Sequence, residues 1–205
     1  MRQFHPLKIQ SITRETDDAV SIIFDVPADL KETYAYEQGQ HVVLKAQVNG
    51  EELRRNYSIC ASKGDDQLRV AVKRIPDGRF SSFANEILKS GDTIEVFPPA
   101  GHFYADLDAK DARHYVAFAG GSGITPVLSN IKTVLEEEPQ SRFTLCYGNR
   151  NVPAIIFLEE LAALKNRFMG RLEIFHFLEE EEDEISLFNG RLDQAKIEEL
   201  LGSII

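Results

Sequence analysis

Arg54-Arg55-Asn56-Tyr57-Ser58-Ile59-Cys60 is the stretch on which the fold prediction depends. It follows an apolar run over residues 41–48 and an Asn49-Gly50 turn signal, so it is predicted to be a strand in a barrel or sandwich. Because side chains alternate faces along a strand, Arg55 and Tyr57 would project from one surface with the next serine beside them. A cation, a flat aromatic ring and a hydroxyl in one place would suit a flavin dinucleotide. An ordinary strand with an exposed arginine and a cross-strand tyrosine pair is the alternative.

The first half of the chain contains short segments with strand signals, separated by turn residues. The pattern predicts a six-stranded antiparallel Greek-key barrel in a domain over residues 1–107. Apolar residues at helical spacing interrupt the strands once, after a Pro76-Asp77-Gly78 turn, with Ser81 or Ser82 as the N-cap. The expected strands are 4–13, 19–26, 41–48, 54–61, 68–75 and 93–97, and the expected helix is 79–88.

The second half alternates strands with helices, which is typical of a parallel sheet built from βαβ units. This predicts a Rossmann-like α/β domain over residues 112–205, joined to the barrel by a polar linker at roughly 105–112. The expected strands are 114–119, 142–147 and 172–178, and the expected helices are 125–137, 155–167 and 193–200.

Composition excludes several classes. With 205 residues, a net charge of −10 and a pI near 5.0, the chain lacks the basic surface that nucleic acids require. No apolar run is long enough for a membrane span, and no signal peptide is recognisable, so we expect a soluble cytoplasmic protein. Cys60 and Cys146 are expected to be buried free thiols, with no metal site. Two cysteines cannot supply the four ligands of a plant-type [2Fe–2S] cluster.

An acidic run over residues 179–184 is either a solvated loop or a docking patch for a basic partner.

Two glycine turns each precede a predicted helix, where free N–H groups and the helix dipole favour a phosphate. The first, Gly78-Arg79-Phe80-Ser81-Ser82, could hold a pyrophosphate or be a plain helix start. The second, Gly120-Gly121-Ser122-Gly123, follows the first strand of the α/β half, where glycine turns bind dinucleotides, although a tight turn without a ligand is the alternative. Arg150, after the next strand, could pair with a nucleotide 2′-phosphate or be a loop arginine.

In combination these segments resemble the ferredoxin–NADP reductase superfamily. The matching motifs follow one another in the order found in that superfamily and cover nearly the whole chain. Residues 51–60 and 78–81 look closest to the reductase components of phenylacetyl-CoA epoxidases within it. The motifs that carry the resemblance are Arg55-Asn56-Tyr57-Ser58, Gly78 with Ser81, Pro99-Ala100-Gly101-His102-Phe103, Gly121-Ser122-Gly123-Ile124-Thr125-Pro126, Tyr147-Gly148-Asn149-Arg150 and Asn189-Gly190-Arg191-Leu192-Asp193.

The resemblance implies an FAD-dependent NAD(P)H oxidoreductase that passes electrons to an iron–sulfur protein, domain or oxygenase, in phenylacetate degradation by analogy with that subfamily. It implies Tyr57 and Ser58 as catalytic residues, next to the flavin ring and its N5. The FAD-binding set that it implies is Arg55, Tyr57, Ser58, Val72, Lys73, Gly78, Phe80, Ser81 and Ser82. The implied set for the nicotinamide nucleotide is Gly121, Gly123, Thr125, Asn149 and Arg150.

Two departures qualify this resemblance. The sequence stops at Ile205, before the family's C-G-P-x-x-M segment, and the C-terminal iron–sulfur domain of the epoxidase reductases is missing. We therefore expect a fragment of a longer reductase, or self-association through the open sheet edge beside residues 114–119. A flavin-binding module that cannot turn over NAD(P)H on its own is the alternative function. The residues leave both NADH and NADPH open as donors.

Overall fold

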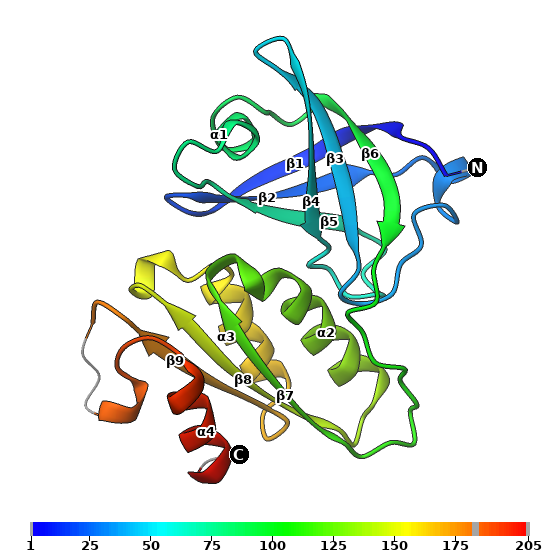
Figure 1. Cartoon of the computed structure of the whole chain (residues 1–205). Coiled ribbons are helices and arrows are strands. Elements are labelled where there is room, and N and C mark those ends of the chain that lie inside the picture. The colour runs from blue at the N-terminus through cyan, green and yellow to red at the C-terminus, as the bar shows by residue number, and fades with distance from the viewer. Residues whose placement is uncertain (1, 182–184, 204–205) are drawn as a thin grey trace. The chain divides into compact units, whose positions relative to one another are not determined.

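The computed structural model describes residues 2–181 and 185–203, and the chain folds into two compact units. One contains residues 1–105 together with 125–133, and the other contains residues 106–124 together with 134–205. Figure 1 shows the six strands of the first unit and the sheet and helices of the second.

The first unit is an antiparallel barrel, as expected. Its strands follow the order β4-β3-β6-β1-β2-β5, with β6 between the β1–β2 and β3–β4 hairpins in a Greek-key arrangement. A bridge between Ile59 and Val70 joins the end of β4 to β5. The bounds are β1 (His5–Thr16), β2 (Ala19–Asp25), β3 (His41–Val48), β4 (Glu51–Ser58), β5 (Leu68–Lys73) and β6 (Thr93–Ala100).

The β3–β4 hairpin sets the register of the strand that carries the opening motif. Asn49 and Gly50 have φ values of 53° and 80°, as a two-residue type I′ turn requires. The turn pairs Tyr57 with Val42 and Arg55 with Leu44, two residues of the barrel core. Strand β4 therefore begins directly after Gly50 and runs over Glu51–Ser58. Both of its ends come a few residues before those of the predicted strand, 54–61.

Helix α1 (Arg79–Glu86) packs on this barrel through Phe80 and Ala84. The predicted N-cap at Ser81 or Ser82 is wrong, because the N-cap is Gly78. Ser81 lies inside the helix, and its hydroxyl binds the preceding turn instead.

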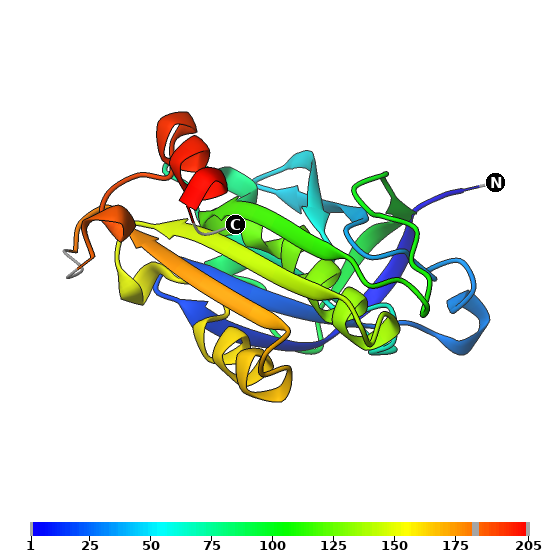
Figure 2. The ribbon, with the colours of Figure 1, turned by 90° about the horizontal axis from the view of Figure 1, so that it is seen from below.

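The second unit contains a parallel sheet with the order β7-β8-β9, which confirms the expected three-stranded α/β architecture. Figure 2 shows β7 at one edge, β9 at the other, and α3 and α4 on opposite faces. The bounds are β7 (His114–Gly120), α2 (Ile124–Glu137), β8 (Arg142–Asn149), α3 (Leu158–Arg167), β9 (Leu172–Leu178) and α4 (Gln194–Ser203).

Helix α3 begins later than the predicted residue 155. The Asn151 side chain caps a short 3-10 turn over Val152–Ala154, and Phe157 has a left-handed φ of 65° that keeps residue 157 out of the helix. On the opposite face of the sheet, Cys146 and Phe177 pack against Leu200 of α4. Residues 182–184 of the acidic run lie outside the described part of the chain.

Within the described residues, no helix combines the length and the apolar character that crossing a membrane requires.

Candidate functional site

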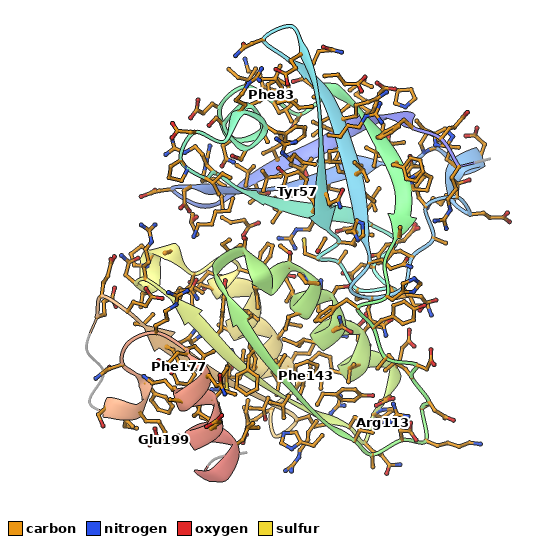
Figure 3. The ribbon with its side chains drawn as sticks, viewed as in Figure 1. Tyr57, Phe83, Arg113, Phe143, Phe177 and Glu199 are labelled. Carbon is orange, nitrogen blue, oxygen red and sulfur yellow. The ribbon has the colours of Figure 1, made fainter. Side chains whose placement is uncertain are left out.

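Strand β4 carries the cation and the aromatic ring on one side, as its register requires. Arg55 is exposed, and its Nη1 donates a hydrogen bond to the Arg54 carbonyl at 2.7 Å. Tyr57 (Figure 3) is half-buried, and its ring centroid lies 5.6 Å from that of Phe80 in α1. Burial raises the pKa of Tyr57 to about 12, against the opposing effect of the Arg55 guanidinium, so the phenol stays neutral at physiological pH.

The neighbouring Arg54 is also exposed, but its guanidinium is already engaged by neighbouring side chains. Its guanidinium binds the Glu52 carboxylate at 2.6 Å and lies over the Phe4 ring, with 5.3 Å from Cζ to the ring centroid. Adjacent residues of a strand point to opposite faces. The two arginines therefore face different surroundings, and only Arg55 lies on the side of Tyr57.

The turn before α1 is closed so tightly that only glycine fits at residue 78. A Cβ there would lie 2.3 Å from Ser81 Oγ and 2.4 Å from Ile75 Cγ1. The Ser81 hydroxyl donates to the Gly78 carbonyl at 3.0 Å and accepts from the Ile75 N–H at 3.2 Å. Ser81 is therefore buried and engaged, which leaves the backbone N–H groups of the first helical turn as the groups able to meet an anion.

A hollow of about 510 Å³ lies against this turn. It lies between the β3–β4 hairpin tip and α1. The Arg79 guanidinium on its rim binds the Glu51 carboxylate and the Val48 carbonyl. The lining residues are Val48, Asn49, Asp77, Gly78, Arg79, Ser82, Phe83, Glu86 and Ile87.

These features fit a dinucleotide with a diphosphate and a planar ring. A glycine turn that excludes a Cβ lets backbone N–H groups approach phosphate oxygens, and an exposed arginine supplies a charged donor.

The remaining residues expected for FAD lie in β4, β5 and α1. The side chains of Val72 and Phe80 are in the barrel core, so Val72 could meet a ligand only through its backbone. Lys73 Nζ lies 3.7 Å from an Asp18 carboxylate oxygen. Ser58 is half-buried and pairs with His41 of β3.

The second glycine turn is held in place from the neighbouring strand. Gly121 has a positive φ of 47° and starts a 3-10 turn over Gly121–Gly123 that leads into α2. The Tyr147 hydroxyl of β8 donates to the Gly121 carbonyl at 2.9 Å. A Cβ at Gly123 would meet nothing within 4 Å, whereas Thr125 is buried. The turn is therefore rigid at its start and open at its end.

The carboxyl end of β8 holds buried polar atoms without well-formed hydrogen bonds to the described residues. Asn149 is 5% exposed and its amide lies beside the Tyr147 hydroxyl, but neither amide atom forms a hydrogen bond of acceptable geometry among the described residues. Nδ1 of His176 also forms no hydrogen bond among the described residues. His176 lies opposite Tyr147 in the register of β8 and β9. Buried polar groups are almost always hydrogen-bonded, so this strand end suits a polar ligand such as a nucleotide. Arg150 is exposed, and its carbonyl accepts the N–H groups of residues 179 and 180.

Sequence reasoning missed Tyr147 and His176 as single residues. Tyr147 stands out along the chain only as part of a motif, and His176 becomes relevant only through its register with β8. No spacing along the chain reveals that pairing.

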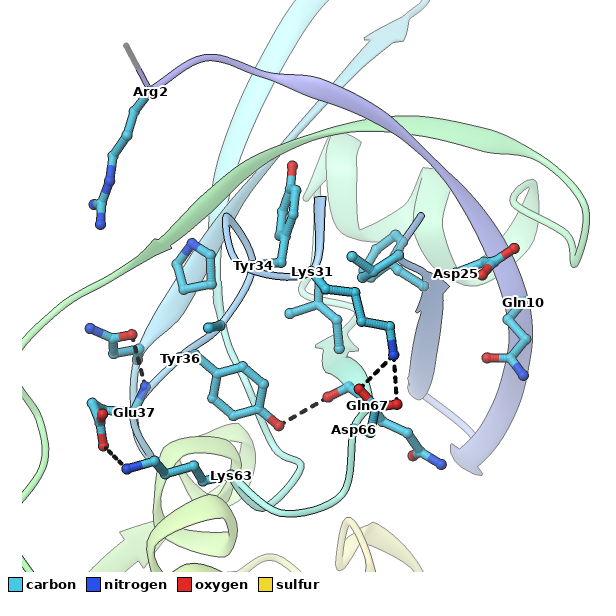
Figure 4. A pocket seen from close by; sticks show the side chains of 16 residues that line it. Arg2, Gln10, Asp25, Lys31, Tyr34, Tyr36, Glu37, Lys63, Asp66 and Gln67 are labelled. Atoms are coloured by element: carbon cyan, nitrogen blue, oxygen red, sulfur yellow. Dashed lines mark hydrogen bonds and ion pairs between the residues drawn. The ribbon is translucent and has the colours of Figure 1, made fainter. Parts of the chain in front are cut away.

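A second hollow in the barrel unit, of about 660 Å³, lies elsewhere (Figure 4). None of the residues expected to bind cofactors is among the described residues that line it. Its lysines already pair, Lys31 with Asp66 at 2.6 Å and Lys63 with Glu37 at 2.9 Å. This hollow is therefore separate from the residues expected to bind cofactors.

Two protein-family models match the two halves of the chain. Residues 6–104 match the oxidoreductase FAD-binding domain, and residues 118–204 match the oxidoreductase NAD-binding domain. The chain is 45% identical, over all of its 205 residues, to one of the subunits of 1,2-phenylacetyl-CoA epoxidase from Escherichia coli K12. The two matches together identify the chain as an oxidoreductase with an FAD-binding and an NAD-binding domain. The expectation that the chain uses FAD and a nicotinamide nucleotide is thereby confirmed.

The chain spans 58% of the length of that epoxidase subunit. It is also 38% identical, over 84% of its length, to the ferredoxin reductase component of 3-ketosteroid-9-alpha-monooxygenase from Rhodococcus rhodochrous, of which it spans 49%. Among solved structures, a ferredoxin NADP+ reductase from Neisseria gonorrhoeae with bound FAD and NADP superposes with a TM-score of 0.75 at 22% identity, covering 97% of this chain and 76% of that one. This last similarity concerns the fold.

Proposed function

We propose that this chain is the flavin- and nicotinamide-binding part of a reductase that takes electrons from NAD(P)H and delivers them to an iron–sulfur carrier or oxygenase. The observation that carries the proposal is the tight Gly78 turn, in the same unit as an exposed Arg55 and a half-buried Tyr57. The similarity to the phenylacetyl-CoA epoxidase subunit supports phenylacetate degradation as its setting.

In this proposal the FAD diphosphate binds the Arg55 guanidinium and the N–H groups at the start of α1. The flavin ring lies against Tyr57, whose own position is set by its contact with Phe80. Ser58 supplies a hydroxyl close to the ring. When bound, FAD supplies the chemistry that protein side chains lack, which is acceptance of a hydride and release of single electrons.

The nicotinamide nucleotide binds the turn over residues 121–123, with Thr125 at the start of α2. Tyr147 fixes the turn, and Asn149 and Arg150 meet the adenosine side. Both amide atoms of Asn149 would gain partners in this way.

Visible absorption and anaerobic mixing test the proposal. The purified chain should bind added FAD and remain yellow after removal of free flavin, and NADH or NADPH should then bleach the flavin absorbance. A colourless chain that does not bind FAD would contradict the proposal.

A flavin-binding module unable to turn over NAD(P)H is the second candidate. It is favoured by the position of β7 at the edge of the three-stranded sheet, since the turn after β7 has a neighbouring strand on one side only among the described residues. FAD binding without rapid bleaching by either nucleotide would support it.

The domain boundary, the assembly and the location complete the proposal. We place the FAD-binding domain at residues 1–107 and the nucleotide-binding domain at 112–205. The segment between them has no regular secondary structure, and the Asp108 N–H donates to the buried Glu138.

The β7 edge is proposed as a surface for self-association. Cys60 and Cys146 are buried thiols that are not joined in a disulfide, which supports a reducing, cytoplasmic location.

A further inference from the structure

Asn85, in the last turn of α1, is a buried side chain with every amide group engaged. It is 7% exposed. Its Nδ2 donates to the Val72 carbonyl at 3.0 Å and to the Ser81 carbonyl at 2.9 Å. Its Oδ1 accepts from Arg14 Nη1 at 3.1 Å, and its carbonyl accepts from Arg14 Nη2 at 2.8 Å. One side chain thus connects α1 to β5 and β1.

The two carbonyls that Asn85 joins belong to residues already assigned to the FAD site. Val72 lies in β5, where only its backbone could meet a ligand, and Ser81 closes the turn before α1. The amide of Asn85 therefore fixes the distance between the backbone of β5 at Val72 and the first turn of α1 at Ser81.

Helix α1 depends on such a contact because it is short. It has 8 residues, about two turns, and an isolated helix of that length is not stable in water. Its position is therefore set by tertiary contacts. Phe80 and Ala84 anchor one face in the core through non-directional packing. The hydrogen bonds of Asn85 and Arg14 are directional and restrict rotation and sliding of the helix.

We infer that Asn85 is a positioning residue, which holds the first turn of α1 against β5 so that its N–H groups meet the FAD diphosphate. This inference rests on the proposed function. Asn85 lies behind the turn and acts through Ser81 and Val72.

The test compares FAD dissociation constants and apo-protein melting temperatures for the full chain and three variants. Asn85→Asp keeps the shape but removes both donors, and Asn85→Leu removes all polar groups. Tyr34→Phe is the matched control. It deletes the hydrogen bonds of the Tyr34 hydroxyl in the same unit, with the Val96 carbonyl at 2.7 Å and with His5 Nδ1 at 3.3 Å, and neither partner is a residue expected to bind FAD.

Both Asn85 variants should weaken FAD binding about tenfold or more, as expected when a directional contact next to a binding site is lost. Tyr34→Phe should lower the apo melting temperature while leaving the FAD dissociation constant within about twofold of wild type. A purely stabilising role for Asn85 predicts the same pattern for all three variants.

Wild-type affinity in both Asn85 variants would overturn the inference while leaving the proposed function intact. Failure of the wild-type chain to bind FAD would overturn both. If neither Asn85 variant folds, Arg14→Met decides, because the exposed Arg14 side chain binds Asn85 Oδ1 and so orients the amide whose Nδ2 meets Val72 and Ser81. Unchanged FAD affinity in that variant would then refute the inference, and weakened affinity at an unchanged apo melting temperature would support it.

Discussion

Replacement of Gly78 by alanine should destabilise the barrel unit and weaken FAD binding. The new Cβ would lie 2.3 Å from Ser81 Oγ and 2.4 Å from Ile75 Cγ1. These distances are roughly 1 Å or more below an ordinary contact between heavy atoms. The φ of Gly78 is −77°, which any residue adopts, so the effect is steric and does not come from backbone strain.

The magnitude follows from what must move. Ser81 Oγ has to leave its position, which breaks its hydrogen bonds with the Gly78 carbonyl and the Ile75 N–H. Each is worth about 1 kcal/mol, and inserting a methyl group into a packed site costs about 1–3 kcal/mol. We therefore expect the free energy of unfolding to fall by about 3–5 kcal/mol, with FAD binding at least about tenfold weaker because the turn opens.

Urea denaturation of the apo-protein measures the first effect. Far-ultraviolet circular dichroism and tyrosine fluorescence are suitable probes, since the chain has no tryptophan. Gly123→Ala is the control for stability. It also precedes a helix, has a φ of −62°, and its Cβ would meet nothing within 4 Å, so its effect should stay within about 0.5 kcal/mol. A Gly78→Ala variant as stable as Gly123→Ala, with wild-type FAD affinity, would refute the steric reasoning.

Three further predictions concern single side chains. Arg55→Gln should weaken FAD binding about tenfold or more with little change in stability, whereas Arg54→Gln, on the opposite face, should leave FAD affinity unchanged in the same titration. Tyr147→Phe frees the Gly121 carbonyl, so steady-state kinetics should show a KM for NAD(P)H raised several-fold (about 1 kcal/mol) with FAD affinity unchanged. Burial, followed by the charge of Lys165, lowers the pKa of His176, so the folded state favours neutral imidazole. The imidazole of the unfolded chain, with a pKa of about 6.5, therefore takes up a proton at a higher pH than the imidazole of the folded chain. Lowering the pH from about 7.5 to about 5.5 should lower the melting temperature, and the decrease should be smaller in His176→Gln.

The strands were predictable where turn residues mark their limits. Strand β3 runs over His41–Val48, as predicted, because a glycine segment precedes it and Asn49-Gly50 follows. Strand β9, Leu172–Leu178, also has its predicted limits and lies between Gly170 and the acidic run. The start of α3 was not predictable, because it depends on the left-handed backbone of Phe157, and a bulky aromatic residue gives no signal for that conformation.

The candidate site shows a similar limit at the level of atoms. The motif at Gly78 and Ser81 suggests that the serine hydroxyl meets a phosphate, yet in the structure this hydroxyl is turned inward and closes the turn. Serine and glycine are therefore coupled, because the space that a Cβ at residue 78 would need is filled by the Ser81 Oγ. The pair shapes the backbone, and the backbone supplies the donors. Asn85 extends the same principle one helical turn further, where an asparagine without any motif links the serine carbonyl to β5. Residues that act by holding the backbone leave weak signals in a sequence, since their partners are carbonyls whose positions only the fold determines.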